Sequence, residues 1–287
     1  MKNFAFINAP DIKSALNILD KEGGRTYLVA GGTNALVDIR AGKINERLLV
    51  NIRDIGDLAG IKCEGDKLII GAATTLSEIA ASLLVQEKAP ALFMAANDFA
   101  DPTTRASATI AGNIVNASPA ADTAPPLLAH QAEVVIVSEK SGHRRVAIND
   151  FFLGFGKTVL EPNELITAIE IPVNPMSSFY KLGLRNAMAI SVITAAVALQ
   201  KDEQNVITEC TIALGSVAPR PVRALNTEEA LIGCEIDENI EGIIAEAIVK
   251  DISPIDDIRA SAEYRLSVAP VIIKRAILQA AGQRREK

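Results

Sequence analysis

The sequence predicts an α+β protein made of two domains. The chain has 287 residues, which is enough for two domains of ordinary size. A segment rich in proline at residues 172–175 separates two patterns, and after it strands come first and helices follow. That order is typical of a small α+β layer domain. We therefore expect one domain over residues 1–174, with an internal break near 55–60, and a second over 175–287.

The first domain is expected to begin with a helix and to continue with strands and further helices. Asp11 stands at the start of a run with helical spacing of apolar residues, and Gly23 ends it. A strand follows, after which Thr33 is placed to cap the next helix. Thr75 and Glu78 form a capping box for a helix that runs to about Val85. The other predicted elements are a helix at 91–97 and strands at 26–30, 48–52, 61–63, 68–72, 132–137, 144–148 and 165–171.

The second domain is predicted to contain a three-stranded antiparallel sheet packed on helices. The strands are expected at 179–184, 190–199 and 206–214, where apolar and β-branched residues dominate. Helical patterns follow from residue 227, over 238–250 and over 258–281.

Composition excludes several classes of protein. The net charge of −6 argues against a general nucleic-acid binder. No apolar run approaches the roughly 20 residues that a membrane span needs, and no signal peptide opens the chain, so we expect a cytoplasmic protein. The cysteines Cys63, Cys210 and Cys234 are scattered, and the histidines His130 and His143 are isolated. Neither pattern predicts a metal site or an iron–sulfur cluster in this chain.

The stretch LVAGGTNAL at residues 28–36 ends a predicted strand on two adjacent glycines. Paired glycines adopt positive φ easily and leave their backbone N–H groups uncovered. Such a turn can hold an anion, because successive N–H groups form a positive concavity. The alternative is a tight strand-to-helix turn with no ligand, and this stretch taken alone favours that alternative.

A second unusual stretch, residues 101–126, is rich in small and hydrogen-bonding residues but poor in Lys and Glu. A loop of this length inside a compact domain is usually functional or disordered, and its apolar residues argue against disorder. Small residues let the backbone approach a flat ligand, while Thr109, Asn113, Ser118 and Asp122 supply polar contacts. Asp122 is equally well explained as the cap of a helix over 123–129.

The two stretches together resemble the FAD-binding subunits of the molybdenum hydroxylases, the family of xanthine, carbon monoxide and nicotinate dehydrogenase flavoproteins. The matching motifs are LVAGGTNAL and TIAGNIVNASPAADTAP, the latter at residues 109–125. The resemblance continues through FFLG at 151–154 and ELI at 164–166, and it ends with RASAEYR at 259–265. It implies a two-lobed PCMH-type FAD-binding domain, followed by a C-terminal domain like that of the carbon monoxide dehydrogenase flavoprotein.

The resemblance also implies a role for individual residues. Both glycine stretches would hold the FAD diphosphate, and Asp122 would bond its sugar or ribityl region. Phe99 and Ile166 would lie along the cofactor, and Lys181 would place a cation near the flavin ring; read alone, Ile166 is equally a core residue and Lys181 a surface lysine. No catalytic or metal-binding residue is expected. The implied cofactor-binding residues are Leu28, Val29, Ala30, Gly31, Gly32, Thr33, Asn34, Ala35, Phe99, Thr109, Ile110, Ala111, Gly112, Asn113, Asp122, Ile166 and Lys181.

Two residues depart from the family pattern. Asn34 stands where the family often has Asp, and an amide can replace much of a structural contact made by a carboxylate. Ala111 replaces the first glycine of the usual Gly-Gly pair, and its methyl group is expected to restrict φ and to crowd the phosphate.

The implied function is that of an FAD-carrying subunit in a molybdopterin-dependent dehydrogenase. Its partners would be a large molybdopterin subunit and a small [2Fe–2S] subunit, and electrons would pass through FAD to NAD⁺ or another acceptor. Two alternatives remain: a self-contained PCMH-type flavin oxidoreductase, and a non-catalytic scaffold subunit. A nicotinamide-binding Rossmann domain is excluded, because the chain lacks G-x-G-x-x-G after a strand.

Overall fold

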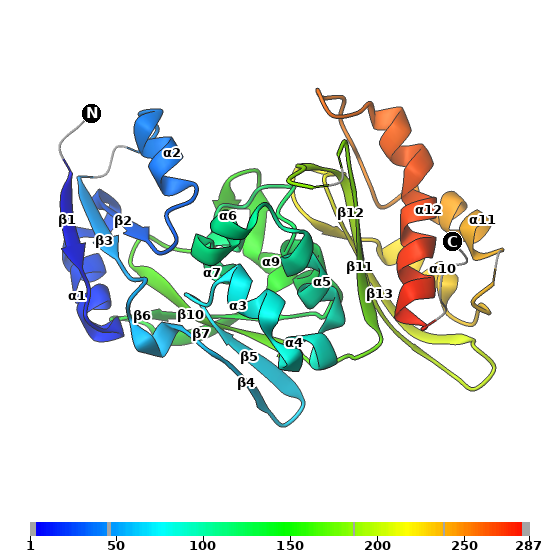
Figure 1. The fold of residues 1–287 in the computed structure, drawn as a ribbon, viewed down its shortest axis with the longest axis horizontal. Helices are drawn as coiled ribbons and strands as arrows, with labels where there is room; N and C mark the ends of the chain where they lie inside the picture. The colour runs from blue at the N-terminus through cyan, green and yellow to red at the C-terminus, as the bar shows by residue number, and fades with distance from the viewer. Residues whose placement is uncertain (1–3, 45–46, 186, 238, 283–287) are drawn as a thin grey trace.

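A computed structural model describes residues 4–44, 47–185, 187–237 and 239–282, arranged as two lobes and a C-terminal domain in a row (Figure 1). The first lobe is a parallel sheet of order β1-β3-β2 with two helices. Its elements are β1 (Ala5–Asn8), α1 (Ile12–Glu22), η1 (Gly23–Arg25), β2 (Thr26–Val29), α2 (Ala35–Arg40), β3 (Leu48–Asn51) and η2 (Gly56–Leu58).

Of the two helices in this lobe, α1 begins and ends at the residues that the sequence predicts, whereas α2 is not capped by the predicted residue. Asp11 caps α1 by accepting a hydrogen bond from the Ser14 N–H at 2.7 Å, and Gly23 ends the helix with a φ of +50°. The prediction that Thr33 caps α2 is wrong. The N-cap is Asn34, which makes no side-chain capping bond, so both residues leave their side chains available at the loop.

The second lobe is built on an antiparallel sheet of order β4-β5-β10-β6-β7, with a separate β8-β9 ribbon. Its strands are β4 (Ile61–Glu64), β5 (Lys67–Gly71), β6 (Glu133–Ser138), β7 (Gly142–Ala147), β8 (Phe152–Gly154), β9 (Lys157–Thr158) and β10 (Glu164–Pro172). Its helices are α3 (Leu76–Ala81), α4 (Leu83–Lys88), α5 (Pro90–Asp98), α6 (Pro102–Ser107), α7 (Ile110–Val115), α8 (Ala124–Ala129) and α9 (Ile148–Phe151).

Local capping divides the helical part of this lobe into short pieces. The predicted box at Thr75 and Glu78 is confirmed, but the helix ends at Ala81, because Ser82 caps a new helix, α4. The stretch 101–126 is not one long loop. It contains α6, capped by Asp101, then α7, capped by Thr109, and the start of α8, so its polar residues first organise the backbone.

The C-terminal domain consists of an antiparallel sheet covered by three helices (Figure 1). The three predicted strands are present, and a two-residue strand extends the sheet at its edge. The strands are β11 (Ser177–Gly183), β12 (Ser191–Lys201), β13 (Ile207–Gly215) and β14 (Val222–Arg223), and the helices are α10 (Leu225–Leu231), α11 (Ile240–Ile248) and α12 (Ala262–Ala280).

Both faces of this sheet are buried, which explains the nearly continuous apolar run in β12. Ala196 and Ala198 face the second lobe, where α5 and α8 pack against the sheet. Val197 and Leu199 face the opposite way, toward the core shared with α12. Small residues on one face allow close approach of the neighbouring domain, and large residues fill the core on the other. The C-terminal domain is therefore packed firmly against the lobe that precedes it.

His130, at the end of α8, connects the second lobe to the start of the C-terminal sheet. Its Nδ1–H donates to the carbonyl of Pro172 at 3.0 Å, which leaves Nε2 to accept from the hydroxyl of Ser177 at 3.0 Å. The Ala91 N–H donates to the same hydroxyl oxygen at 3.2 Å. These hydrogen bonds are satisfied by a neutral imidazole, and burial lowers the pKa of His130 to about 4.

This geometry predicts a loss of stability in mild acid. In the unfolded chain the imidazole takes up its proton near its ordinary pKa of 6.5, while the folded protein holds it neutral down to about 4. Stability from this residue is therefore present above pH 6.5 and lost as the pH falls to about 4, by about 3 kcal/mol in total. The measurement is denaturant unfolding across this range for wild type and His130→Gln. The wild-type curve should be the steeper of the two, and parallel curves would contradict the prediction.

Candidate functional site

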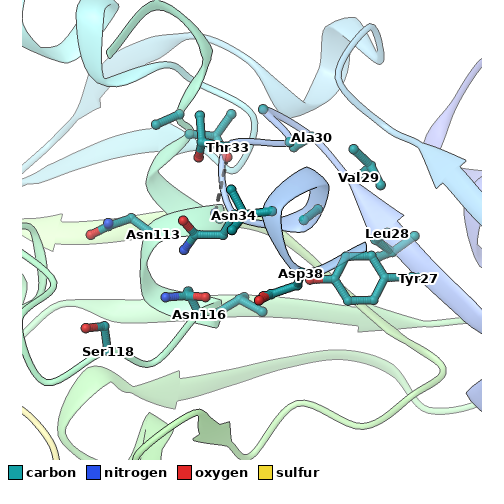
Figure 2. A pocket seen from close by; sticks show the side chains of 18 of the residues that line it. Tyr27, Leu28, Val29, Ala30, Thr33, Asn34, Asp38, Asn113, Asn116 and Ser118 are labelled. Atoms are coloured by element: carbon teal, nitrogen blue, oxygen red, sulfur yellow. Dashed lines mark hydrogen bonds between the residues drawn. The ribbon is translucent and has the colours of Figure 1, made fainter. Parts of the chain in front are cut away.

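Both glycine stretches line one cavity of about 650 Å³ between the first and second lobes (Figure 2). Thr33 and Asn34 come from the loop after β2, whereas Asn113 and Asn116 come from α7 and its C-terminal end. The predicted residues that line this cavity are Leu28, Val29, Ala30, Gly31, Gly32, Thr33, Asn34, Ala35, Phe99, Thr109, Gly112 and Asn113.

Gly31 is the point at which the two stretches meet. A Cβ atom at this position would lie 1.8 Å from the carbonyl oxygen of Ser107 and 3.1 Å from Cα of Ala108. No side chain larger than hydrogen fits there without moving the backbone. Gly32 has a φ of +70°, a conformation that other residues rarely adopt. Glycine is therefore needed at the two positions for different reasons. Gly31 allows close approach of the Ser107 backbone, and Gly32 allows the turn with positive φ.

The backbone of the first loop offers free donors to the cavity. Among the described residues, no acceptor pairs with the N–H groups of Gly31, Gly32, Thr33 and Asn34. Backbone N–H groups in folded proteins find a partner in protein, water or ligand. Successive N–H groups around a turn with positive φ form a site that favours an anion.

The N–H groups of residues 110–112 in the second stretch are already occupied. Ile110 N–H donates to Thr74 and Ala111 N–H to Ala72, while Gly112 N–H is capped by the Thr109 hydroxyl. These residues therefore offer no uncovered N–H groups to a ligand, unlike the first loop. This wall offers side chains instead: Asn113 accepts from Thr123 at 2.6 Å through Oδ1, which leaves its Nδ2 as a donor toward a ligand.

The charges that line the cavity balance. Within the described residues, Lys43 is the one cation among the lining side chains, and it pairs with Asp38 at 3.1 Å. An anionic group in this cavity is therefore held by backbone N–H groups and side-chain amides rather than by an unpaired positive charge. A dinucleotide diphosphate fits this donor set, since it presents several acceptor oxygens close together.

Sequence reasoning missed part of the wall. Tyr27, Asp38 and Lys43 line one region of the cavity, and Phe155 with Gly156 lines another. Phe155 lies between two glycines in the motif GFG at 154–156, and its side chain is 74% exposed. Nothing in the sequence around Lys43 predicted that it lines the cavity.

Asp122 and Lys181 were predicted to meet the cofactor separately, and the structure pairs them with each other. The Lys181 Nζ lies 2.6 Å from Oδ2 of Asp122, both side chains are buried, and Nζ also donates to the Asp98 carbonyl at 3.2 Å. Burial raises the pKa of Asp122 to about 6, and Lys181 partly opposes that rise. Oδ1 of Asp122 is buried without a partner among the described residues, so one acceptor stays available. Asp122 does not cap α8, whose N-cap is Thr123.

Three predicted residues lie in the hydrophobic core and not on the cavity wall: Ile110, Ala111 and Ile166. The methyl group of Ala111 therefore packs among core residues, and it does not crowd the cavity as expected from the lost glycine. Ala111 is also not among the residues with positive φ, so alanine is unstrained at this position. Gly112 is the residue of the pair that lines the cavity.

The residues present fit FAD. Gly31 allows the first loop to lie in close contact with the backbone of Ser107, the first loop supplies free N–H donors, and the buried Oδ1 of Asp122 remains unpaired among the described residues. No group of three or more His, Cys, Asp or Glu suited to a metal occurs in the described residues. Over the same residues, no helix has the length and apolar character of a membrane span.

Comparison with known families gives matches over nearly the whole chain. Residues 2–174 match the family described as FAD binding domain in molybdopterin dehydrogenase. Residues 178–280 match the CO dehydrogenase flavoprotein C-terminal domain.

Individual relatives agree with these matches. The xanthine dehydrogenase FAD-binding subunit of Escherichia coli O157:H7 is 34% identical, over 98% of this chain and 97% of its own length. The carbon monoxide dehydrogenase medium chain of Afipia carboxidovorans is 33% identical, over 97% and 96%. A solved structure of reconstituted CO dehydrogenase from Oligotropha carboxidovorans superposes with a TM-score of 0.93 at 30% identity, covering 99% of both chains.

The family resemblance drawn from the motifs and the α+β fold predicted from the order of strands and helices are thereby confirmed. The similar proteins are named as dehydrogenase subunits or medium chains, in agreement with an oxidoreductase subunit. The chain belongs to the molybdenum hydroxylase family, as an FAD-binding subunit of the molybdopterin-dependent dehydrogenases.

Proposed function

We propose that this chain carries electrons from [2Fe–2S] clusters of a small partner subunit, through its FAD, to NAD⁺ or another acceptor. A large molybdopterin subunit would oxidise the substrate. The complex would work in the cytoplasm. The domains of this chain would be residues 1–174, which bind FAD, and 175–287, which pack against them.

The observation that carries the proposal is the shared cavity of the two glycine stretches. The uncovered N–H groups of the first loop face a wall formed by Thr109, Gly112 and Asn113. The contact of Gly31 with the Ser107 backbone fixes the distance between those walls. A diphosphate held by such a site needs no positive side chain, which agrees with the Asp38–Lys43 pairing.

The residues of this chain bind and orient the cofactor and shape its surroundings. When bound, FAD supplies a redox carrier that couples one-electron donors to a hydride acceptor. Asp122 and Lys181 form a buried pair, so the positive charge of Lys181 is compensated while the carboxylate is ionised.

Anaerobic reduction by NADH tests the acceptor. If NAD⁺ is the acceptor, hydride transfer also runs in reverse. NADH added to the isolated FAD-loaded chain is then expected to reduce the flavin and to bleach its visible absorbance. Reduction of the flavin by a purine or an aldehyde without partner subunits would instead favour a self-contained oxidoreductase. A purified chain that is colourless and takes up no FAD would favour the scaffold. Bleaching by neither NADH nor substrate in a yellow protein would contradict NAD⁺ while leaving the FAD site standing.

A further inference from the structure

The C-terminal end of α5 is held by two cationic side chains from other parts of the chain. An α-helix leaves its last carbonyls without partners inside the helix, and positive charge is favoured near this end. Nη1 of Arg105 donates to the carbonyls of Asn97 at 3.2 Å, Phe99 at 2.7 Å and Ala100 at 3.2 Å. Nζ of Lys181 donates to the remaining carbonyl, at residue 98. The four consecutive carbonyls of residues 97–100 therefore all accept from a positively charged group.

The backbone turns at this point through a conformation that its own sequence does not favour. Ala100 has a φ of +42°, in the left-handed region that residues other than glycine rarely adopt. The bonds from Arg105 reach carbonyls on both sides of this turn, so they stabilise it from outside. Arg105 itself lies on α6, which begins directly after the turn and is capped by Asp101. The turn and α6 thus form one unit that the Arg105 side chain closes.

Phe99 is the residue that this unit fixes in place. Its side chain lines the FAD cavity and packs against the core of the second lobe. Arg105 is not among the described residues that line this cavity, and its guanidinium reaches only the backbone of the turn. Because the ring moves with its own backbone, a displaced Phe99 carbonyl displaces the ring as well. Arg105 can therefore act on a ligand in the cavity through Phe99.

The same short helix also reaches the first glycine loop. α6 ends at Ser107, whose carbonyl oxygen lies against Gly31. Arg53, which follows β3, donates from Nη2 to the Ala106 carbonyl at 3.2 Å. One end of α6 thus meets the first lobe, and its Arg105 side chain holds the turn that carries Phe99. Two parts of the cavity wall are placed relative to each other by this helix.

We infer that Arg105 is a positioning residue of the FAD site, which holds Phe99 against the bound cofactor. The inference requires the FAD site alone, and neither the electron acceptor nor the partner subunits proposed above. The alternative is that Arg105 only stabilises the end of α5. In that case its loss affects the fold and has no effect on FAD binding that depends on Phe99.

The test is FAD titration of the full-length apo-chain for Arg105→Met, Phe99→Ala and the double variant. Arg105→Met keeps an apolar stem and removes the donors, and Arg105→Gln replaces it if the methionine variant does not fold. Lys201→Met is the matched control. Lys201 donates to the Ala281 carbonyl at the end of α12, at 3.3 Å, and it does not line the FAD cavity. Circular dichroism and the thermal unfolding midpoint of each variant report on the fold.

Arg105→Met is expected to weaken FAD binding about tenfold, as for the loss of hydrogen bonds from a charged group. Phe99→Ala should have an effect of similar size, and the double variant should bind within about twofold of Phe99→Ala, because both changes remove the same contact. Arg105→Lys should recover binding to within about threefold of wild type, since an ammonium group keeps the charge and offers three donors. Lys201→Met should stay within about twofold of wild type.

Three results would overturn the inference. The first is a loss of about 100-fold in the double variant, because multiplied effects would mean that Arg105 acts independently of Phe99. The second is FAD binding by Arg105→Met that equals that of Lys201→Met. The third is unchanged FAD binding by Phe99→Ala, which would remove the contact through which Arg105 acts.

Discussion

Replacing Gly31 by alanine is expected to weaken FAD binding about 100-fold. The added Cβ would lie 1.8 Å from the carbonyl oxygen of Ser107, which is backbone and cannot rotate away. The first loop must therefore separate from the segment before α7. Forced separation of packed backbone costs on the order of 3 kcal/mol, which corresponds to about 100-fold in affinity. The measurement is FAD titration of the apo-chain, followed by flavin fluorescence.

The control for Gly31→Ala is Gly24→Ala. A Cβ atom added at Gly24 would meet no other atom within 4 Å, and this glycine does not require positive φ. Its substitution should leave the FAD dissociation constant within about twofold of wild type, as for a surface change. Circular dichroism of both variants shows whether the fold is intact, so that weaker FAD binding by a folded Gly31→Ala protein reports on the loop contact alone. If Gly31→Ala binds FAD as tightly as Gly24→Ala does, the convergence of the two stretches has no role in cofactor binding.

Replacing Lys181 by methionine is expected to destabilise the fold by about 3 kcal/mol near neutral pH, because it leaves the Asp122 carboxylate buried without its partner. The pKa of Asp122 is already raised to about 6 by burial. A carboxylate with a raised folded pKa stabilises the fold below its unfolded pKa, and that stability is lost as pH rises through the folded value. Loss of Lys181 raises this pKa further, so the destabilisation relative to wild type should grow as the pH rises above about 6, as measured by denaturant unfolding.

Two further variants make this test specific. Lys140→Met removes a surface pair with Asp20, in which the lysine side chain is 70% exposed, and it should cost less than about 1 kcal/mol. The double variant Asp122→Leu with Lys181→Met removes both charges, and it should recover most of the lost stability. If Lys181→Met lowers the free energy of unfolding only slightly, and by the same amount at every pH, the pair does not join the two domains.

Local signals in the sequence predicted the fold well where a cap or a glycine acts on its neighbours. Asp11 and the Thr75–Glu78 box opened helices at the expected residues. Local signals failed where two of them compete: Thr33 and Asn34 are both good caps, and the backbone selected Asn34. The helices α6 and α7 have only six residues each, which is too short for a hydrophobic period to be visible.

The wall of the candidate site formed by the first glycine stretch was predictable from the sequence, and the wall formed by the second stretch was less so. Residues 28–35 were adjacent in sequence, so one motif marked a whole wall of the cavity. In the second stretch the cavity and the core alternate along a helix, and the motif alone does not show that Gly112 faces one and Ala111 the other. The burial of Ile166 followed from its strand, β10, and not from any contact with the cavity.

The pairing of Asp122 with Lys181 could not be found by pattern. The two residues are 59 positions apart and come from different domains. Their meeting depends on how α8 packs on the C-terminal sheet, where small residues such as Ala196 allow close approach. Read alone, Asp122 fitted a helix cap and Lys181 fitted a surface lysine, and only the tertiary arrangement makes them partners.

The central claim is that one cavity holds the FAD diphosphate through the free N–H groups of the first glycine loop. Competitive titration of the apo-chain with FAD, riboflavin and ADP tests it most directly. We expect one FAD per chain, displacement of FAD by ADP, and riboflavin binding weaker by about 100-fold or more, since riboflavin lacks the diphosphate. Riboflavin binding as tightly as FAD, with ADP unable to compete, would contradict the claim.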